Sequence, residues 1–210
     1  MASIRAGFTR TVAWTGLARP VREVEEVMGS VPRDRFVPPD PRPHAFEDRA
    51  LSIGYGATIS QPFIVALMTS IARLRPEHRV LEVGTGSGYQ SAILGKLASE
   101  VFTLEIVPEL RERSAAVLAE LGHANVHVLD GDGWRGLAAH APFDVILVTA
   151  CATGVPEALR DELACGGRMV LPIESGAHQQ LIMVEKDESG ATTQQVVLPV
   201  SFVPMVGRGS

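Results

Sequence analysis

The residues with the clearest chemical potential form a glycine-rich loop, EVGTGSG at 82–88, which follows a run of apolar residues typical of a buried strand. A segment with helical spacing comes directly after the loop. Glycine permits a tight turn and lets a ligand approach the backbone, and the first turn of a helix offers unpaired N–H groups. The loop therefore predicts a cofactor site, although a structural turn would account for one or two of its glycines.

Two carboxylates indicate which cofactor suits this loop. Glu82 stands two residues before Gly84, and Glu105 ends the next strand-like run, 21 residues after that glycine. The position of Glu105 is where dinucleotide-type folds place an acid against the ribose hydroxyls. An acid in the place of Glu82 repels a diphosphate and suits a ligand with positive charge. S-adenosylmethionine carries an ammonium and a sulfonium and no phosphate, so we expect it rather than NAD as the cofactor.

The elements that must position this loop alternate along the chain. Strand-like runs are separated by stretches with helical spacing, and this alternation implies a parallel sheet with helices on both faces. Two late apolar segments, QQLIMVEKD and QQVVLPVSF, predict a closing hairpin. We expect a three-layer, doubly wound, Rossmann-like α/β sandwich, mostly parallel, with an antiparallel C-terminal edge hairpin. The expected strands cover residues 79–83, 100–106, 125–131, 143–150 and 165–173, and the first expected helices cover 21–31 and 62–74.

Composition favours one compact domain, since 210 residues with 46% hydrophobic residues can bury about 70% of the unfolded surface. Within it we expect residues 1–61 to form an N-terminal helix and an irregular segment that covers the substrate. We expect residues 62–210 to form the cofactor-binding core. Four arginines and no acid in residues 1–22 weakly resemble a transit peptide, but glycines interrupt the helix that such a peptide needs.

Charge and cysteine content exclude several classes of partner. The net charge is −5 and no basic run is present, so we expect no nucleic-acid partner. No apolar run reaches the length of a membrane span, so we expect no membrane partner. The two cysteines have neither metal nor redox spacing, which indicates no metal site and a reducing, cytoplasmic location. We expect a monomer.

S-adenosylmethionine is a methyl donor, and the residues after the fourth expected strand indicate which classes of molecule could accept the methyl group. Enzymes that methylate amino groups of nucleic acids carry Asn/Asp-Pro-Pro-aromatic there, whereas this chain has TACA at 149–152. Cys151 could act as the nucleophile of a pyrimidine carbon methyltransferase, but it lacks the usual preceding proline. A buried structural cysteine is the alternative.

Three further segments resemble the protein-L-isoaspartate O-methyltransferase family: VPRDRFVP (31–38), AFEDRALSIGYGATISQP (45–62) and LPVSFVPMVG (198–207). Together with EVGTGSGYQSA (82–92), the resemblance spans most of the chain. The family uses S-adenosylmethionine to methylate the free α-carboxylate of L-isoaspartyl residues, and the ester returns through a succinimide partly to normal aspartate, which amounts to repair. The resemblance thus implies isoaspartyl proteins or peptides as partners. The family's usual segment is close to GYGQTISQP, and here Ala57 stands in the place of its Gln.

The resemblance also implies roles for individual residues. Ser60 is the expected catalytic residue, which would orient the carboxylate or the cofactor, and a helix N-cap is its alternative role. No general base is needed, because an α-carboxyl group has a pKa of about 3.3–3.7 and is ionised at neutral pH. Asp132 is expected at the adenine, although Asp132-Gly133 would also suit a turn. The expected cofactor-binding residues are Glu82, Gly84, Thr85, Gly86, Ser87, Gly88, Glu105, Asp132 and Gly133. The expected substrate-binding residues are Thr58, Ile59, Val203 and Val206.

Two other functions stay open. A relative of this family could methylate a normal Asp of one dedicated peptide to form an aspartimide, and the departure at Ala57 is compatible with that role. A non-catalytic S-adenosylmethionine-binding protein with the same fold is the second alternative, against which the presence of Ser60, Glu82, Glu105 and Asp132 argues.

Overall fold

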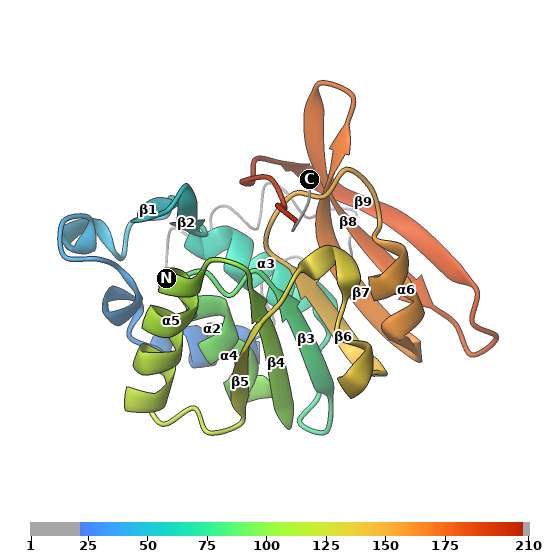
Figure 1. The fold of residues 1–210 in the computed structure, drawn as a ribbon, viewed down its shortest axis with the longest axis horizontal. Helices are drawn as coiled ribbons and strands as arrows, with labels where there is room; N and C mark the ends of the chain where they lie inside the picture. The colour runs from blue at the N-terminus through green and yellow to red at the C-terminus, as the bar shows by residue number, and fades with distance from the viewer. Residues whose placement is uncertain (1–21, 208–210) are drawn as a thin grey trace.

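The computed structural model describes residues 22–207 and confirms the expected α/β class (Figure 1). Residues 1–21, which hold most of the N-terminal arginines, and residues 208–210 lie outside the described part. A seven-stranded sheet in the order β5-β4-β3-β6-β7-β8-β9 forms the centre. Its strands are β3 (Arg79–Val83), β4 (Glu100–Glu105), β5 (Val126–Asp130), β6 (Phe143–Val148), β7 (Leu163–Ser175), β8 (His178–Lys186) and β9 (Thr192–Val200).

The strand directions match the sequence-based expectation. β5, β4, β3, β6 and β7 pair in parallel, while β7–β8 and β8–β9 pair antiparallel, so the C-terminal edge hairpin is confirmed. From β3 the chain proceeds to β4 on one side, and it returns to place β6 on the other side. Ligands of open parallel sheets bind at such a reversal of strand order, outside the carboxyl ends of the strands. This topology places the glycine loop after β3 at that position.

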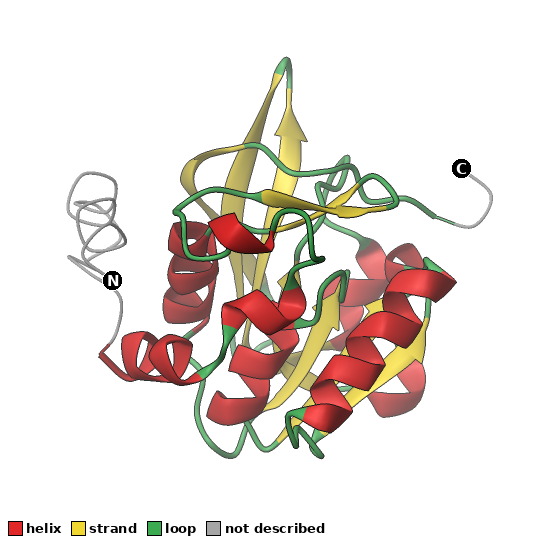
Figure 2. Ribbon diagram, turned by 90° about the vertical axis from the view of Figure 1, so that its left-hand side faces the viewer, coloured by secondary structure: helices red, strands yellow, loops and turns green. Residues whose placement is uncertain are grey.

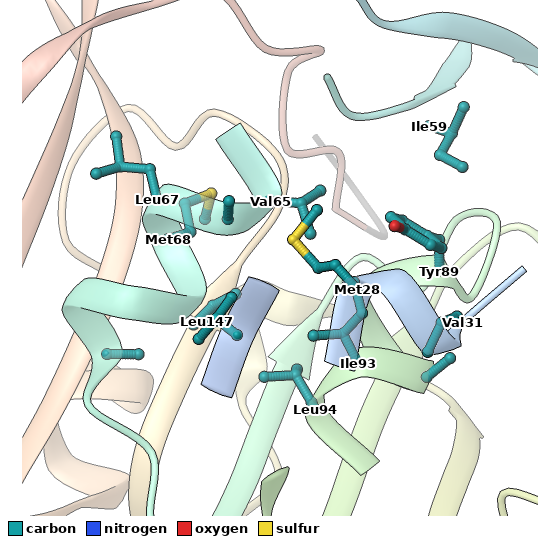
Figure 3. Close-up of a cluster of buried hydrophobic side chains, with 14 of the residues drawn as sticks. Met28, Val31, Ile59, Val65, Leu67, Met68, Tyr89, Ile93, Leu94 and Leu147 are labelled. Carbon is teal, nitrogen blue, oxygen red and sulfur yellow. The ribbon is translucent and has the colours of Figure 1, made fainter. Parts of the chain in front are cut away.

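Helices cover both faces of the sheet, as Figure 2 shows. One apolar cluster joins α2, α3, α4 and α5 to one face, and a second joins α6 and the η3 turn to the other. Figure 3 shows part of the first cluster, in which Met28, Ile59, Tyr89 and Leu147 come from different elements. The helices are α2 (Arg22–Ser30), α3 (Pro62–Ala72), α4 (Tyr89–Leu97), α5 (Pro108–Glu120) and α6 (Glu157–Glu162), and the 3-10 turns are η1 (Arg33–Phe36), η2 (Arg42–His44), η3 (Gly133–Arg135) and η4 (Ala138–His140). None of these described helices is long and apolar enough to cross a bilayer.

The segment before the sheet differs from the expectation of an irregular chain. It contains a short antiparallel hairpin of β1 (Leu51–Gly54) and β2 (Ala57–Ile59) as well as the turns η1 and η2. Leu51, Ile53 and Ile59 point into the first apolar cluster while their neighbours along the strands are exposed. The hairpin is therefore stabilised by burial against the rest of the domain, which short local patterns do not reveal.

Candidate active site

A cavity of about 290 Å³ lies at the carboxyl ends of β3, β4, β5 and β6. Its size falls near the lower end of the range for small-molecule sites. Segments far apart in the sequence form its wall: the β1–β2 hairpin, the loops that follow β3 to β6, and the C-terminal segment 203–206. The lining residues include Tyr55, Gly56, Ala57, Thr58, Gly84, Gly86, Glu105, Ile106, Gly131, Gly133, Thr149, Val203 and Val206.

The glycine loop closes the base of this cavity at a point where side chains do not fit. Gly84 has φ 93°, and a Cβ atom on it would lie 2.6 Å from Oγ1 of Thr149. That hydroxyl donates to the carbonyl oxygen of Gly84 at 2.6 Å and thereby fixes the loop against the end of β6. Gly133 is equally constrained, since a Cβ atom there would lie 2.2 Å from Cγ1 of Val83. Close packing inside the protein thus requires glycine at both positions, and both residues also line the cavity.

Glu105 presents a carboxylate whose orientation is already fixed. Its Oε2 accepts from the backbone N–H of Gly86 at 2.7 Å, and its Oε1 accepts from that of Val107 at 3.0 Å. Glu105 is 5% exposed and lines the cavity. A fixed acceptor at the end of β4 is suited to bind a pair of neighbouring hydroxyls, the chemistry expected for the ribose.

Glu82 lies behind the loop rather than on the cavity wall. Its Oε2 accepts from Oγ1 of Thr103 at 2.6 Å and from the hydroxyl of Ser91 on α4, while Oε1 has no hydrogen-bond partner among the described residues. Complete burial raises the pKa of Glu82 to about 7. Thr85 extends the network, with its hydroxyl 2.6 Å from that of Thr103. Glu82 therefore stabilises the buried side of the glycine loop through hydrogen bonds. It does not line either cavity, so it would affect a bound cofactor only through the position of the loop.

Asp132 caps the η3 turn, with its carboxylate accepting from the N–H of Trp134 at 3.0 Å. The observed contact of the Asp132 side chain is therefore the one expected for a turn at Asp132-Gly133. Its neighbours Gly131 and Gly133 line the cavity. The indole Nε1 of Trp134 donates to the carbonyl oxygen of Met205 at 3.2 Å, which ties the C-terminal segment to this turn.

Ser60 lies at a smaller cavity of about 30 Å³, which shares Thr58, Gly84, Gly86 and Thr149 with the larger one. The alternative of a helix N-cap for Ser60 is wrong: the N-cap position of α3 is Gln61, without a side-chain cap. The N–H of Phe63 in the first turn of α3 is instead satisfied by Oδ1 of Asp48 at 2.9 Å. The remaining residues of the smaller cavity are Ile59, Val65, Thr85, Ser87, Tyr89 and Gln90.

The C-terminal segment reaches the cavity through backbone bonds to Cys151. The N–H of Cys151 donates to the carbonyl oxygen of Val203 at 2.8 Å, and the N–H of Met205 donates to the carbonyl oxygen of Cys151 at 2.7 Å. Burial raises the pKa of the Cys151 thiol, and the residue is 4% exposed. These features favour a structural cysteine over the nucleophile of a pyrimidine methyltransferase.

Several lining residues were not expected from the sequence. Thr149 follows β6 and Ile106 follows β4, so their positions just after parallel strands were an available signal. Tyr55 and Leu110 carried no such signal, since the hairpin and α5 reach the cavity through tertiary packing. Among the described residues, no group of three or more His, Cys, Asp or Glu is arranged to hold a metal ion.

Comparison with known protein sequences extends the resemblance to nearly the whole chain. The family model described as protein-L-isoaspartate(D-aspartate) O-methyltransferase matches residues 16–210. Protein-L-isoaspartate O-methyltransferase 2 of Polaromonas sp. is 48% identical over 209 residues and covers 99% of each chain. Protein-L-isoaspartate O-methyltransferase 1 of Anaeromyxobacter sp. is 50% identical over 207 residues, which covers 98% of this chain and 97% of the relative.

Solved structures agree with this assignment. A protein-L-isoaspartate O-methyltransferase superimposes with a TM-score of 0.84 at 25% identity, covering 98% of this chain and 66% of that one. A putative protein-L-isoaspartate O-methyltransferase from Plasmodium falciparum, in complex with S-adenosyl-L-homocysteine, superimposes with a TM-score of 0.80 at 25% identity and covers 97% of each chain. The resemblance found in the sequence is confirmed, and the chain belongs to the protein-L-isoaspartate(D-aspartate) O-methyltransferase family.

Proposed function

We propose that the cavity beyond β3 and β6 is where this chain methylates the free α-carboxylate of L-isoaspartyl residues, with S-adenosylmethionine as the methyl donor. The chain belongs to a family of such methyltransferases and matches its relatives over nearly their full length. The observation that carries the proposal is the joining of the glycine loop, the Glu105 carboxylate and the Ser60 segment around two adjoining cavities. The ester formed initiates repair through the succinimide.

The residues of the larger cavity fit S-adenosylmethionine. Gly84 and Gly133 line the cavity, and a ligand can approach the backbone of a glycine closely. Glu105 offers an oriented acceptor to the ribose hydroxyls. When bound, the cofactor supplies a methyl group on an electrophilic sulfonium. We assign Gly86 and the neighbouring Thr85, Ser87 and Gly88 to the methionine side of the site, and Asp132-Gly133 to the adenine side.

The smaller cavity holds the side chains that would orient the acceptor. Ser60 and Thr58 carry hydroxyls that can donate to a carboxylate; both line the smaller cavity, and Thr58 lines the larger one as well. Because the α-carboxylate arrives ionised, the protein's task is to align one of its oxygens with the methyl group and to exclude water. Ile59 and the segment from Val203 to Val206 complete the acceptor side of the wall. In this proposal residues 55–60 of the N-terminal segment cover the acceptor site and also contribute Tyr55 to Thr58 to the larger cavity, while the core from residue 62 onward supplies the rest of the cofactor site.

An assay with labelled S-adenosylmethionine tests the proposal most directly. An isoaspartyl peptide should be labelled, whereas its twin with a normal aspartyl residue should not. Equal labelling of the two peptides, or labelling of neither, would contradict the proposal. Labelling of the aspartyl twin alone would favour the dedicated-peptide alternative.

We also infer a cytoplasmic location and a monomeric state. Cys151 and Cys165 are free thiols, a state that a reducing compartment maintains. Light scattering coupled to size-exclusion chromatography should give a mass near 22.5 kDa. A mass of twice that value would contradict the monomer.

A further inference from the structure

Two exposed apolar side chains flank the mouth of the larger cavity. Among the described residues, the large hydrophobic side chains that are exposed are Phe46, Tyr55, Val196 and Val206. Only Tyr55 and Val206 of this set also line the cavity, at 60% and 53% exposed. They come from segments about 150 residues apart, the β1–β2 hairpin and the C-terminal segment. We call these two side chains the rim.

Tyr55 is presented outward by a well-anchored turn. It has φ 55°, a left-handed backbone conformation that is uncommon for a bulky residue. The hairpin below it is fixed, because Ile53 and Ile59 are buried and Nη2 of Arg113 on α5 donates to the carbonyl oxygen of Ile53 at 2.8 Å. A bulky residue persists in such a conformation only where the surrounding structure holds it, and such positions cluster at ligand sites. The backbone that carries the ring is therefore anchored, while the ring itself lies outside the protein's own core.

Val206 is fixed in a similar way on the opposite segment. The residue before it, Met205, is buried and bonded through its backbone to both Cys151 and Trp134. The side chain of Val206 nevertheless stays exposed at the cavity wall. Both rim residues thus offer preorganised apolar surface at the entrance.

The substrate explains why apolar surface would be useful there. The acceptor is one residue of a polypeptide, and a cavity of about 290 Å³ is too small to enclose the cofactor together with the residues on either side of the acceptor. Those neighbours must remain outside, against the entrance. A tyrosine gives a large contact area at a low entropic cost, because its side chain has two rotatable angles.

We propose that the rim of Tyr55 and Val206 contacts the side chains next to the isoaspartyl residue and so selects substrates with large apolar neighbours. This inference rests on the proposed function and adds a specificity to it. Partial burial of one leucine-sized side chain supports about a fivefold to tenfold preference. The selectivity would direct the enzyme to damaged sites whose apolar neighbours have become exposed.

Steady-state kinetics on two isoaspartyl peptides test the rim. The peptides differ only in the residues that flank the isoaspartyl residue, which are leucines in one and serines in the other. For the wild type we expect kcat/KM to be about fivefold to tenfold higher for the leucine peptide. In Tyr55→Ser and Val206→Ser the ratio of the two kcat/KM values should fall towards one.

Phe46→Ala is the matched control, since Phe46 is an exposed aromatic residue of the same N-terminal segment that does not line the cavity. In Phe46→Ala the ratio of kcat/KM for the leucine peptide to that for the serine peptide should equal the wild-type ratio. Equal kcat/KM values for both peptides in the wild type would overturn the rim proposal and leave the proposed function intact. A loss of rate in Tyr55→Ser by the same factor for both peptides would also overturn it, since Tyr55 would then serve the cofactor or the fold. If the wild type methylates neither peptide, the proposed function itself fails.

Discussion

At the scale of single residues, the two glutamates of the sequence pattern have different tasks. Glu105 lines the cavity and is held by two backbone N–H groups, as its place after a parallel strand suggested. The position of the Glu82 side chain could not be predicted in the same way, because the pleat of β3 determines the face of the sheet to which this side chain points. Alternation puts Glu82 on the same face as Val80, which packs in the cluster that contains α4. The sequence pattern identified both glutamates beside the glycine loop, but the direction and the burial of each side chain determine whether it reaches the cavity.

The burial of Glu82 predicts a specific dependence of stability on pH. Its pKa of about 7 in the folded protein lies above the usual value of 4.5. Between these values the folded state keeps a proton that the unfolded state has lost, so the free energy of unfolding falls as pH rises and then levels off above pH 7. The loss is on the order of 3 kcal/mol. Urea denaturation at pH 5 and pH 8 should show this loss in the wild type but a smaller one in Glu82→Gln. Glu112→Gln, on the exposed side of α5, is the control, and an unchanged pH dependence in Glu82→Gln would contradict the prediction.

If Ser60 orients the acceptor carboxylate and Glu105 binds the ribose hydroxyls, as proposed above, substitutions at the two residues should affect turnover and cofactor binding separately. Ser60→Ala removes a donor to the acceptor carboxylate, and we expect kcat to fall about tenfold or more while the cofactor Kd changes little. Glu105→Ala removes the acceptor for the ribose, and we expect the cofactor Kd to rise about tenfold or more. Calorimetric titration with S-adenosylhomocysteine and initial rates give the two quantities. Unchanged turnover in Ser60→Ala would show that the Ser60 hydroxyl does not orient the acceptor carboxylate.

At the scale of elements, the regular strands and helices were predictable, including α2 in place of the helix expected over 21–31, whereas the hairpin between α2 and α3 was not. The apolar runs of β3 to β6 and the helical spacing of α3 to α5 are strong local signals, and the observed bounds differ from the expected ones by about two residues. β1 and β2 have four and three residues and follow a proline-rich stretch. Their stability comes from burial and from the bond of Arg113 to Ile53, which are tertiary contacts. Ser60 lies between this hairpin and α3, so its position depends on both.

Asp48 is the side chain that secures the start of α3. Its Oδ1 accepts from the N–H of Phe63, in the position that a capping residue would otherwise serve. Asp48→Ala should lower the free energy of unfolding by about 1 kcal/mol, as measured by urea denaturation. Asp48→Asn keeps an acceptor oxygen and should retain most of the stability. Equal losses in the two variants would show that the hydrogen bond is not the cause.

At the scale of the whole molecule, the cavity joins parts that belong to different apolar clusters. The hairpin belongs to the first apolar cluster, whereas Met205 and the η3 turn belong to the second, on the other face of the sheet. The glycine loop lies between them at the reversal of strand order. The fold class and this location followed from the sequence pattern. The two outer walls were expected only from the family resemblance, through Thr58, Val203 and Val206, and not from the local pattern, because their meeting depends on contacts between segments about 150 residues apart.

This arrangement predicts that a bound ligand stabilises both walls at once. S-adenosylhomocysteine at about 100 times its Kd should add roughly 2.7 kcal/mol to the free energy of unfolding, which for a domain of this size raises Tm by about 5–10 °C. Amide hydrogen exchange should slow in both the hairpin, residues 51–59, and the C-terminal segment, residues 203–206, because each gains contacts with the ligand. At the same ligand concentration Glu105→Ala should show a smaller rise in Tm. Protection confined to the glycine loop would mean that the outer walls do not close on the cofactor, and it would restrict the hairpin to contacts with the acceptor peptide.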